Sequence, residues 1–222
     1  MTNPGLSCLA ILNGGGSTGD GVYWINPMNI AYQVYCNMTT SGGGWTMVLM
    51  AADNATTFDW DSAYWTNTTT VNPGTVDPTQ DVDVKSSAFN DISFTAMNFC
   101  LGTITQCVAE TVTATSAVTV FQGGSQIDTS KTITNFAVWQ NFSGWYQGCQ
   151  RAGFDVQDTA NTDGKPASVR YGILLNNEAT CEGSVDGAIG FGTRGYFGTE
   201  TSAGSGDGVI PISYRRGWIF VR

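Results

Sequence analysis

Short runs of apolar residues, some of them alternating with polar residues, are separated along the chain by glycine-rich turns. Residues 31–36 (AYQVYC) alternate aromatic or aliphatic side chains with polar ones, which predicts a half-buried strand. Residues 45–52 (WTMVLMAA) are almost wholly apolar and predict a fully buried strand. Residues 169–177 (VRYGILLNN) and 217–222 (GWIFVR) predict two further buried strands. The pattern therefore favours a chain that is rich in β-structure.

Between these strands the sequence follows no single pattern, and no segment predicts a long helix. Residues 7–12 (SCLAIL) indicate a short helix or turn, and residues 22–27 (VYWINP) a short strand that ends at Pro27. Residues 88–145 contain several stretches rich in valine, threonine and phenylalanine with a period of two, which is typical of strands. Residues 151–168 are polar, and we expect a loop there.

Residues 53–87 differ from the rest of the chain because they hold few aliphatic residues and many aspartates and threonines. A polar stretch of this length inside a globular chain predicts a functional or ion-holding loop. The full length of 222 residues suits one large domain with a sizeable core. We therefore predict a single α+β domain over residues 1–222 that is β-rich and loop-rich.

Composition and net charge limit the classes of binding partner that we expect for this chain. Charged residues make up only 12% of the chain, and the formal net charge is −9. An acidic chain repels phosphate backbones and anionic lipid headgroups, so nucleic acid and membrane surfaces are excluded as expected partners and divalent cations are favoured. No apolar run approaches the ~20 residues that span a bilayer, so we expect no membrane insertion. The chain opens without a leader sequence, and we expect that a signal peptide has been removed.

The chain has six cysteines and no histidine, which determines the disulfides it can form and the catalytic sites it can build. An even number of cysteines without C-x-x-C pairs predicts disulfides, an oxidising compartment and hence a secreted or cell-surface protein. Cys8 and Cys36 are expected to pair and to close a loop of roughly 30 residues, worth about 3 kcal/mol. The other four allow Cys100–Cys107 with Cys149–Cys181, or Cys100–Cys181 with Cys107–Cys149. Without histidine there is no Ser-His-Asp triad, no Cys-His dyad and no histidine-ligated zinc.

The stretch YCNMTTSGGGWT, residues 35–46, is the most informative motif in the chain. Three glycines allow positive φ angles and a close approach of the backbone, and Trp45 then begins an apolar strand. We interpret the stretch as a structural clasp made of a disulfide, a tight turn and a buried tryptophan.

This opening resembles that of the fibrinogen-related domains. The resemblance rests on Cys8, the segment GDGVYWINP and the segment YQVYCNMTTSGGGWTMV, with Asn37 where that family usually has aspartate. The ending, with GFGTRGYFG and IFVR, is similar to the intelectin (X-type lectin) branch. The resemblance implies a fibrinogen C-terminal-like or intelectin-like fold, with a disulfide-clasped N-terminal subdomain over residues 8–50 and a loop-rich, calcium-holding remainder over residues 51–222.

A glycine-rich segment near the C-terminus carries the first group of candidate site residues. Calcium takes six to eight oxygen ligands from carboxylates and carbonyls on flexible backbone. In the intelectin-like lectins, calcium at the corresponding place takes two vicinal hydroxyls of a sugar, with the help of a histidine that this chain lacks. The resemblance implies a calcium site formed by Glu182, Asp186, Glu200 and Asp207. It implies ligand contacts from Glu182, Glu200 and the aromatic residues Tyr196, Phe197, Tyr214 and Trp218.

A second acidic group lies in the polar loop. The segments D-W-D and D-V-D place two carboxylates on one face of an extended chain, because side chains repeat every two residues in a strand. These pairs suit calcium or an acidic rim, and the spacing is not that of an EF-hand. The predicted metal ligands are Asp59, Asp61, Asp81 and Asp83, with Asp77 nearby and with Trp60, Tyr64 and Trp65 as a candidate carbohydrate groove.

The sequence thus leads to three hypotheses of different classes. The first is a secreted or surface-displayed lectin-like module that binds glycans or other cell-surface ligands with the help of calcium and breaks no bonds. The second is a structural or adhesive subunit of a surface or filament, which uses calcium only for stability and forms homo-oligomers. The third, a glycoside hydrolase, needs two carboxylates ~5–10 Å apart, and nothing in the sequence marks such a pair.

Overall fold

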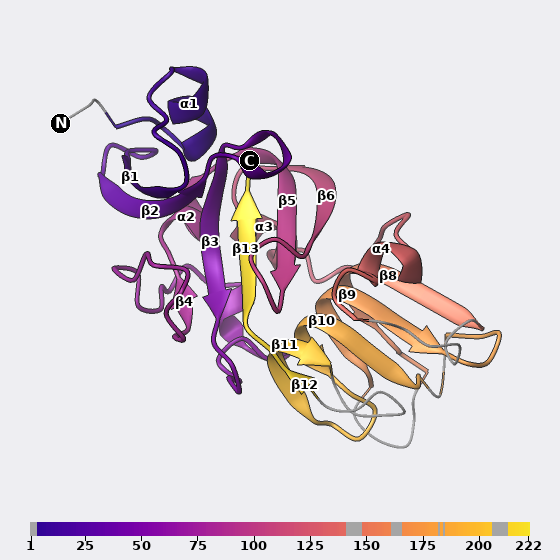
Figure 1. Ribbon diagram of the computed structural model, residues 1–222. Coiled ribbons are helices and arrows are strands. Elements are labelled where there is room, and N and C mark those ends of the chain that lie inside the picture. The colour runs from indigo at the N-terminus through magenta and orange to yellow at the C-terminus, as the bar shows by residue number, and fades with distance from the viewer. Residues whose placement is uncertain (1–3, 141–147, 161–165, 182, 184, 206–212) are drawn as a thin grey trace.

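The last strand of the chain lies in the middle of the first sheet. In a computed structural model of the chain, β13 (Gly217–Val221) pairs in an antiparallel manner with β3 (Trp45–Ala51) on one side and with β5 (Phe94–Leu101) on the other. All five residues of β13 are buried. This sheet therefore joins the N-terminal and C-terminal parts of the chain, as Figure 1 shows.

The structure describes residues 4–140, 148–160, 166–181, 183, 185–205 and 213–222. The order of the first sheet is β1-β2-β3-β13-β5-β6, and β4 pairs with β3 from outside this path. Its remaining strands are β1 (Gly21–Ile25), β2 (Tyr32–Asn37), β4 (Val84–Lys85) and β6 (Cys107–Ala114).

The second sheet has the order β12-β11-β10-β9-β8-β7, and each of its neighbouring strands is antiparallel. Its strands are β7 (Ile127–Asp128), β8 (Cys149–Gln157), β9 (Ser168–Asn176), β10 (Gly187–Arg194), β11 (Glu200–Ser205) and β12 (Ser213–Tyr214). In Figure 1 this sheet occupies the opposite end of the molecule from β1 and β2.

The helices are short and lie between strands. They are α1 (Cys8–Asn13), η1 (Thr40–Gly42), η2 (Ala63–Trp65), α2 (Ala88–Asp91), α3 (Ala117–Gln122) and α4 (Ile133–Phe136). Ser7 begins α1 because its side-chain oxygen accepts a hydrogen bond from the Ala10 amide. Within the described residues, no helix is long and apolar enough to cross a bilayer. The prediction of a β-rich chain with short helices, including one near residues 7–12, is confirmed.

All six cysteines form disulfides, between Cys8 and Cys36, Cys100 and Cys107, and Cys149 and Cys181. The first pairing is the one the sequence predicts, and the others follow the first of the two open arrangements. Cys100 and Cys107 face each other at one end of the β5–β6 hairpin. Three disulfides fit an oxidising compartment.

The triple-glycine turn has the predicted role. Gly42, Gly43 and Gly44 all have positive φ angles, and a Cβ on Gly43 would lie 2.0 Å from the Met38 carbonyl oxygen. Trp45 follows at 4% exposure, so the turn delivers it directly into the interior. The interpretation of this stretch as a structural clasp is confirmed.

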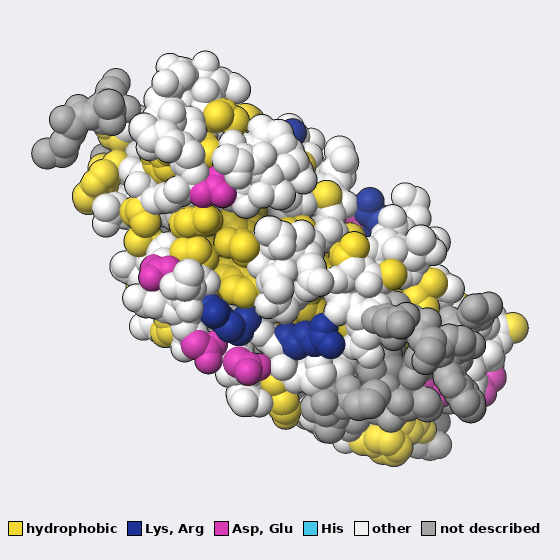
Figure 2. All heavy atoms as spheres, viewed as in Figure 1, with side chains coloured by type: hydrophobic (Ala, Val, Ile, Leu, Met, Phe, Trp, Pro, Cys, Tyr) yellow, Lys and Arg dark blue, Asp and Glu magenta, His cyan; other side chains and the backbone are white. Residues whose placement is uncertain are grey.

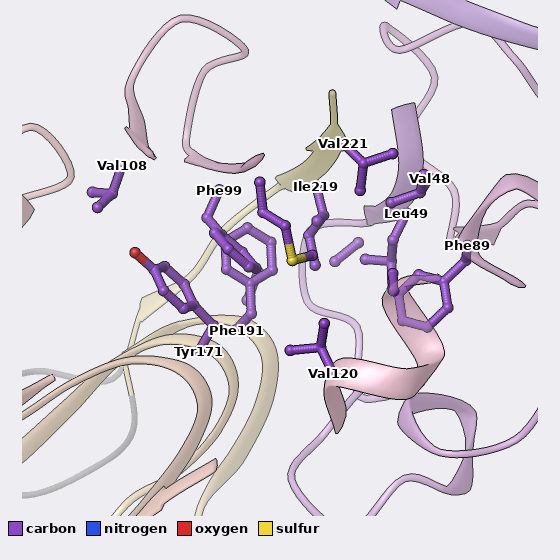
Figure 3. Packing of buried hydrophobic residues seen from close by; sticks show 14 of the residues in the cluster. Val48, Leu49, Phe89, Phe99, Val108, Val120, Tyr171, Phe191, Ile219 and Val221 are labelled. Carbon is purple, nitrogen blue, oxygen red and sulfur yellow. The ribbon is translucent and has the colours of Figure 1, made fainter. Parts of the chain in front are cut away.

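The main core fills the space between the two sheets. Phe99 of β5 stacks on Tyr171 of β9 with ring centroids 3.5 Å apart, and Phe154 and Phe191 pack around this pair. Figure 3 shows Phe99, Tyr171 and Phe191 close together, with Ile219 of β13 beside them. The Tyr171 hydroxyl donates to Glu110 over 2.9 Å, so the buried polar atom is satisfied.

A row of glycines crosses the second sheet. Gly153 of β8 lies opposite Gly172 of β9, which lies opposite Gly190 of β10, which lies opposite Gly204 of β11. Gly190 has a φ of 151°, and a Cβ there would lie 2.1 Å from the Tyr171 carbonyl oxygen. Only glycine fits such a backbone, so the row lets the four strands approach and bend together.

The expected loop at residues 151–168 is wrong for its first part, because residues 151–157 belong to β8. Gly153 and the polar residues of the segment are typical of a loop sequence, but Ala152, Phe154 and Val156 are buried against the rest of the sheet.

The expectation of a long loop from residue 53 to the eighties is confirmed, since only η2 and β4 interrupt it.

Gly190→Ala tests the glycine row. The added methyl group meets backbone atoms that cannot move without breaking the ladder, so we expect the free energy of unfolding to fall by about 3 kcal/mol or more. Urea denaturation followed by circular dichroism measures the change. Gly123→Ala is the matched control, because nothing lies within 4 Å of a Cβ there and its φ is −64°. Equal stability of the two variants would contradict this account of the row.

Candidate functional site

The loop that follows β3 is held against the second sheet by backbone hydrogen bonds. The Ser202 amide in β11 donates to the Ala55 carbonyl over 3.0 Å, and the Phe58 amide donates to the Ser202 hydroxyl over 2.8 Å. Trp65 is fully buried and its indole nitrogen donates to the Asp59 carbonyl over 2.9 Å. These bonds fix residues 59–61 beside the β10–β11 hairpin.

Two carboxyl groups from distant parts of the sequence meet at this place. Asp59 of the loop and Glu200 at the start of β11 are joined by a hydrogen bond between their side chains. Burial, the Glu200 charge and hydrogen bond, and the Asp61 charge together raise the pKa of Asp59 to about 6. The nearby Glu200 carboxylate therefore disfavours the ionised form of Asp59.

Arg194, the last residue of β10, partly neutralises the acidic group. Its guanidinium lies 3.0 Å from the Asp61 carboxylate and 3.8 Å from the Glu200 carboxylate. Its Nε also donates to the Pro166 carbonyl over 3.0 Å, so the side chain is held in place. Two of the three carboxyl groups therefore pair with one guanidinium, and the group keeps an excess of negative charge when Asp59 is ionised.

Trp60 lies between the acidic residues and is held by a second arginine. The Arg170 guanidinium carbon lies 4.4 Å from the centre of the Trp60 ring, and its Nε donates to the Trp60 carbonyl over 2.9 Å. Arg170 also donates to Asp155 over 2.8 Å. The indole is thus clamped on the surface of the second sheet, and the acidic side chains on either side of it are clamped with it.

Aromatic side chains stand at the tip of the β10–β11 hairpin. Phe197 is 77% exposed, and its ring meets that of Tyr196 edge to face with centroids 5.2 Å apart. The turn is closed by the Gly195 amide, which donates to the Thr199 carbonyl over 2.9 Å. Because Arg194 and Glu200 flank this turn, the aromatic pair and the acidic group belong to one hairpin end.

The structure places the other predicted ligands as follows. Asp83 accepts from the Ala52 amide over 2.8 Å and from the Thr57 hydroxyl, and Asp81 accepts from the Asp53 amide over 2.8 Å. Asp186 accepts from the Asn177 amide over 2.8 Å. These three carboxylates hold loop backbone in place, and their role as metal ligands stays a prediction.

The remaining candidates divide between the interior and the part of the chain that is not described. Trp218 is 4% exposed and its indole nitrogen donates to the Pro78 carbonyl over 3.1 Å, so it lies in the interior of the first sheet. Tyr214 is half-buried in β12. Glu182 and Asp207 lie outside the described residues. In the part of the chain that the structure describes, no three acidic, histidine or cysteine side chains converge as a metal site.

Arg170 and Arg194 are the functional residues that sequence reasoning missed. Both stand inside strongly apolar text, in VRYGILL and GFGTRGYF, and a cation in a buried strand requires a partner. An arginine within an apolar strand therefore indicates that acidic or aromatic groups approach the strand, but the sequence does not identify these groups.

The comparison with known families covers the first part of the chain. Residues 6–70 match the family described as fibrinogen beta and gamma chains, C-terminal globular domain. The match includes α1, the strands β1, β2 and β3, and the loop that carries Asp59 and Asp61. The two β-sheets, few helices and three disulfides of this structure are consistent with a fibrinogen C-terminal-like fold.

Lys85 anchors the same loop and yields a test by pH. Its ammonium is buried and donates to the carbonyls of Tyr64 and Asn67, over 2.6 and 2.5 Å. Burial lowers the pKa of Lys85 to about 8. Between this value and the ordinary lysine pKa of about 10.5, the unfolded chain binds more protons than the folded one, so stability rises with pH in that window.

We expect the free energy of unfolding to rise by about 2 kcal/mol more in the native protein than in Lys85→Met between pH 7.5 and 9.5. Methionine keeps the packed stem and removes the titrating group, so it serves as the matched reference. Urea denaturation at both pH values measures the difference. Parallel pH dependences for the two proteins would show that Lys85 is not the buried, titrating anchor of the loop.

Proposed function

We propose that this protein is a recognition module that binds carbohydrate through calcium at the Asp59–Glu200 site, in the manner of the intelectin-like branch. The observation that carries the proposal is the contact between these two carboxyl groups, which come from separate segments and meet at the surface end of a hairpin. The matched family is one of ligand-binding domains, which supports a binding role rather than catalysis.

The donor set fits calcium in its chemistry. A divalent cation bound between them would offset the repulsion between the Asp59 and Glu200 carboxylates, and it would favour the ionised form of Asp59. Asp61, whose side chain is 60% exposed and pairs with Arg194, lies close enough to raise the pKa of Asp59 and makes the surroundings of the two carboxyl groups more negative. Calcium bound by Asp59 and Glu200 would supply open coordination positions for hydroxyl groups of a ligand.

The aromatic pair at the hairpin tip supports a carbohydrate ligand. Binding sites combine aromatic surface with a few well-placed polar groups that orient the ligand. Phe197 offers an exposed ring and Tyr196 adds a ring with a hydroxyl group, in the turn between β10 and the start of β11 at Glu200. A sugar ring has apolar C–H faces and vicinal hydroxyls, so it matches both halves of this arrangement.

Hydrolysis of a glycosidic bond is disfavoured by the same contact. Glycosidases hold their two carboxyl groups ~5–10 Å apart so that a sugar or a water molecule fits between them. Asp59 and Glu200 are within hydrogen-bonding reach of each other, which leaves no such space. The site is therefore better suited to hold a cation than to divide acid and base roles.

Isothermal titration with calcium tests the metal site. We expect Asp59→Asn to weaken calcium affinity at pH 7.5 by about tenfold or more, because a charged oxygen ligand is lost. Asp128→Asn is the matched control, since that carboxylate is 64% exposed and lies on β7, outside the site. The native affinity should also fall as pH drops through about 6, because protons then compete for Asp59. Equal calcium affinity in Asp59→Asn and the native protein would show that calcium does not bind at this site.

A glycan array read in millimolar calcium and again in EDTA tests the ligand class. We expect signals that EDTA abolishes, and that Phe197→Ala reduces about tenfold while calcium affinity is unchanged. Val138→Ala, which trims another exposed apolar side chain, should leave the signals intact. Calcium binding that raises the melting temperature without any glycan signal would instead support the structural or adhesive hypothesis.

A further inference from the structure

Apolar side chains gather at the end of the molecule formed by β1 and β2. Five of the eight large hydrophobic side chains that are exposed in the described part of the chain belong to residues 6–30, namely Leu6, Val22, Trp24, Met28 and Ile30. Figure 2 shows some hydrophobic side chains at this end, although the broadest hydrophobic area in that view lies nearer the middle of the molecule. Met28 and Ile30 lie in the turn between the two strands, and 63% and 71% of their surfaces are exposed.

A pocket of about 530 Å³ opens on the same end. It lies between α1 and β1, and its lining includes Ile11 from the helix, Tyr23 and Trp24 from the strand, and Ala31. Most of the lining surface is apolar. Because Ala31 follows Ile30 directly, the protruding turn and the pocket are neighbours on one face.

The strand beside the pocket has an open edge. β1 ends the order of the first sheet and is paired with β2 on one side. On its other side, the described residues place only a single bridge, between Gly5 and Ile25. The strand reads GVYWI and carries no lysine, proline or charge, which are the devices that usually protect an edge from pairing.

Almost all charged side chains of the protein lie outside the β1–β2 end. Residues 1–52 contain one charged side chain, Asp20, although the whole chain has a net charge of −9. The Asp20 carboxylate accepts hydrogen bonds from the Met38 amide over 2.6 Å and from the Thr39 amide over 3.0 Å, so it is occupied within its own hairpin. Net charge of −8 therefore belongs to residues 53–222, from 17 acidic and 9 basic side chains.

We propose that the occupant of this face is a second copy of the chain, in a two-fold homodimer. Two acidic molecules meet the least repulsion where each is uncharged, and that place is the β1–β2 end. The face is also self-complementary, because it carries both protruding side chains, Met28 and Ile30, and an apolar pocket that can receive them. A contact in which each copy gives and receives the same elements closes as a dimer and does not continue as a filament.

Sedimentation velocity over a range of protein concentrations tests the dimer. We expect a monomer–dimer equilibrium whose dissociation constant falls as sodium chloride is raised, because salt screens the repulsion between the acidic remainders of the two copies. The experiment is done in EDTA, so that its outcome does not depend on calcium or on any glycan site.

Ile30→Asp and Met28→Asp should each raise the dimer dissociation constant by about tenfold or more, since each buries an unpaired charge at the contact. The matched control is Ile127→Asp on β7, the edge strand of the second sheet, which is also an exposed isoleucine. It should leave the equilibrium unchanged. Because all three side chains are exposed, the variants should keep the native melting temperature, which confirms that they are folded.

Four results would overturn the proposal. A native protein that stays monomeric up to about 100 µM at both low and high salt would exclude a dimer of useful affinity. The dimer can persist unchanged in Ile30→Asp and Met28→Asp, which places the contact elsewhere. Dissociation by Ile127→Asp alone would assign the contact to the opposite edge of the molecule. A monomer that binds an apolar peptide through Ile30 would assign the face to a foreign partner.

Discussion

The pairing of β13 with β3 is the constraint on which the rest of the structure depends. In this register Gly217 lies opposite Ala51. Ala51 ends β3 and leads directly into the loop that carries Asp59, while Gly217 follows soon after the β10–β11 hairpin that carries Glu200. One backbone pairing therefore brings the two halves of the candidate site together. Gly217 is suited to this place because a Cβ there would lie 2.5 Å from the Phe191 ring of β10, so a larger residue would push the two sheets apart.

Local features of the structure could be predicted from the sequence because their causes are local. The triple-glycine turn, the buried Trp45 and the Cys8–Cys36 disulfide lie within a stretch of about forty residues and follow from backbone sterics and apolar period. The acidic residues at 59 and 61 could be named as candidates for the same reason. Their partner Glu200 was named separately, and nothing in the two segments indicates that they meet, because that contact is set by the β3–β13 register.

The second sheet shows why other elements could not be predicted. Glycine within a strand normally weakens it, so the polar segment around Gly153, residues 151–168, is predicted as a loop. Here each glycine lies opposite another glycine in the next strand, and the cost is shared by a row that lets the strands pack closely. Register between strands is a property of the folded sheet, and a single strand such as β8 carries no sign of it. The same holds for Arg170 and Arg194, whose partners come from neighbouring strands and from the loop that carries Trp60 and Asp61.

The boundary of the family match divides the candidate site. Residues 6–70 contribute the clasp, the first three strands and the carboxyl groups of Asp59 and Asp61. Glu200, Arg194 and the aromatic pair at the hairpin tip come from the part of the chain beyond the match. A cation held between Asp59 and Glu200 would join the two parts, whereas the surface that a ligand touches belongs mostly to the hairpin. The part of the scaffold that resembles the fibrinogen domains would therefore supply one side of the proposed cation site, while the aromatic ligand contacts of the proposal would come from the hairpin beyond the match.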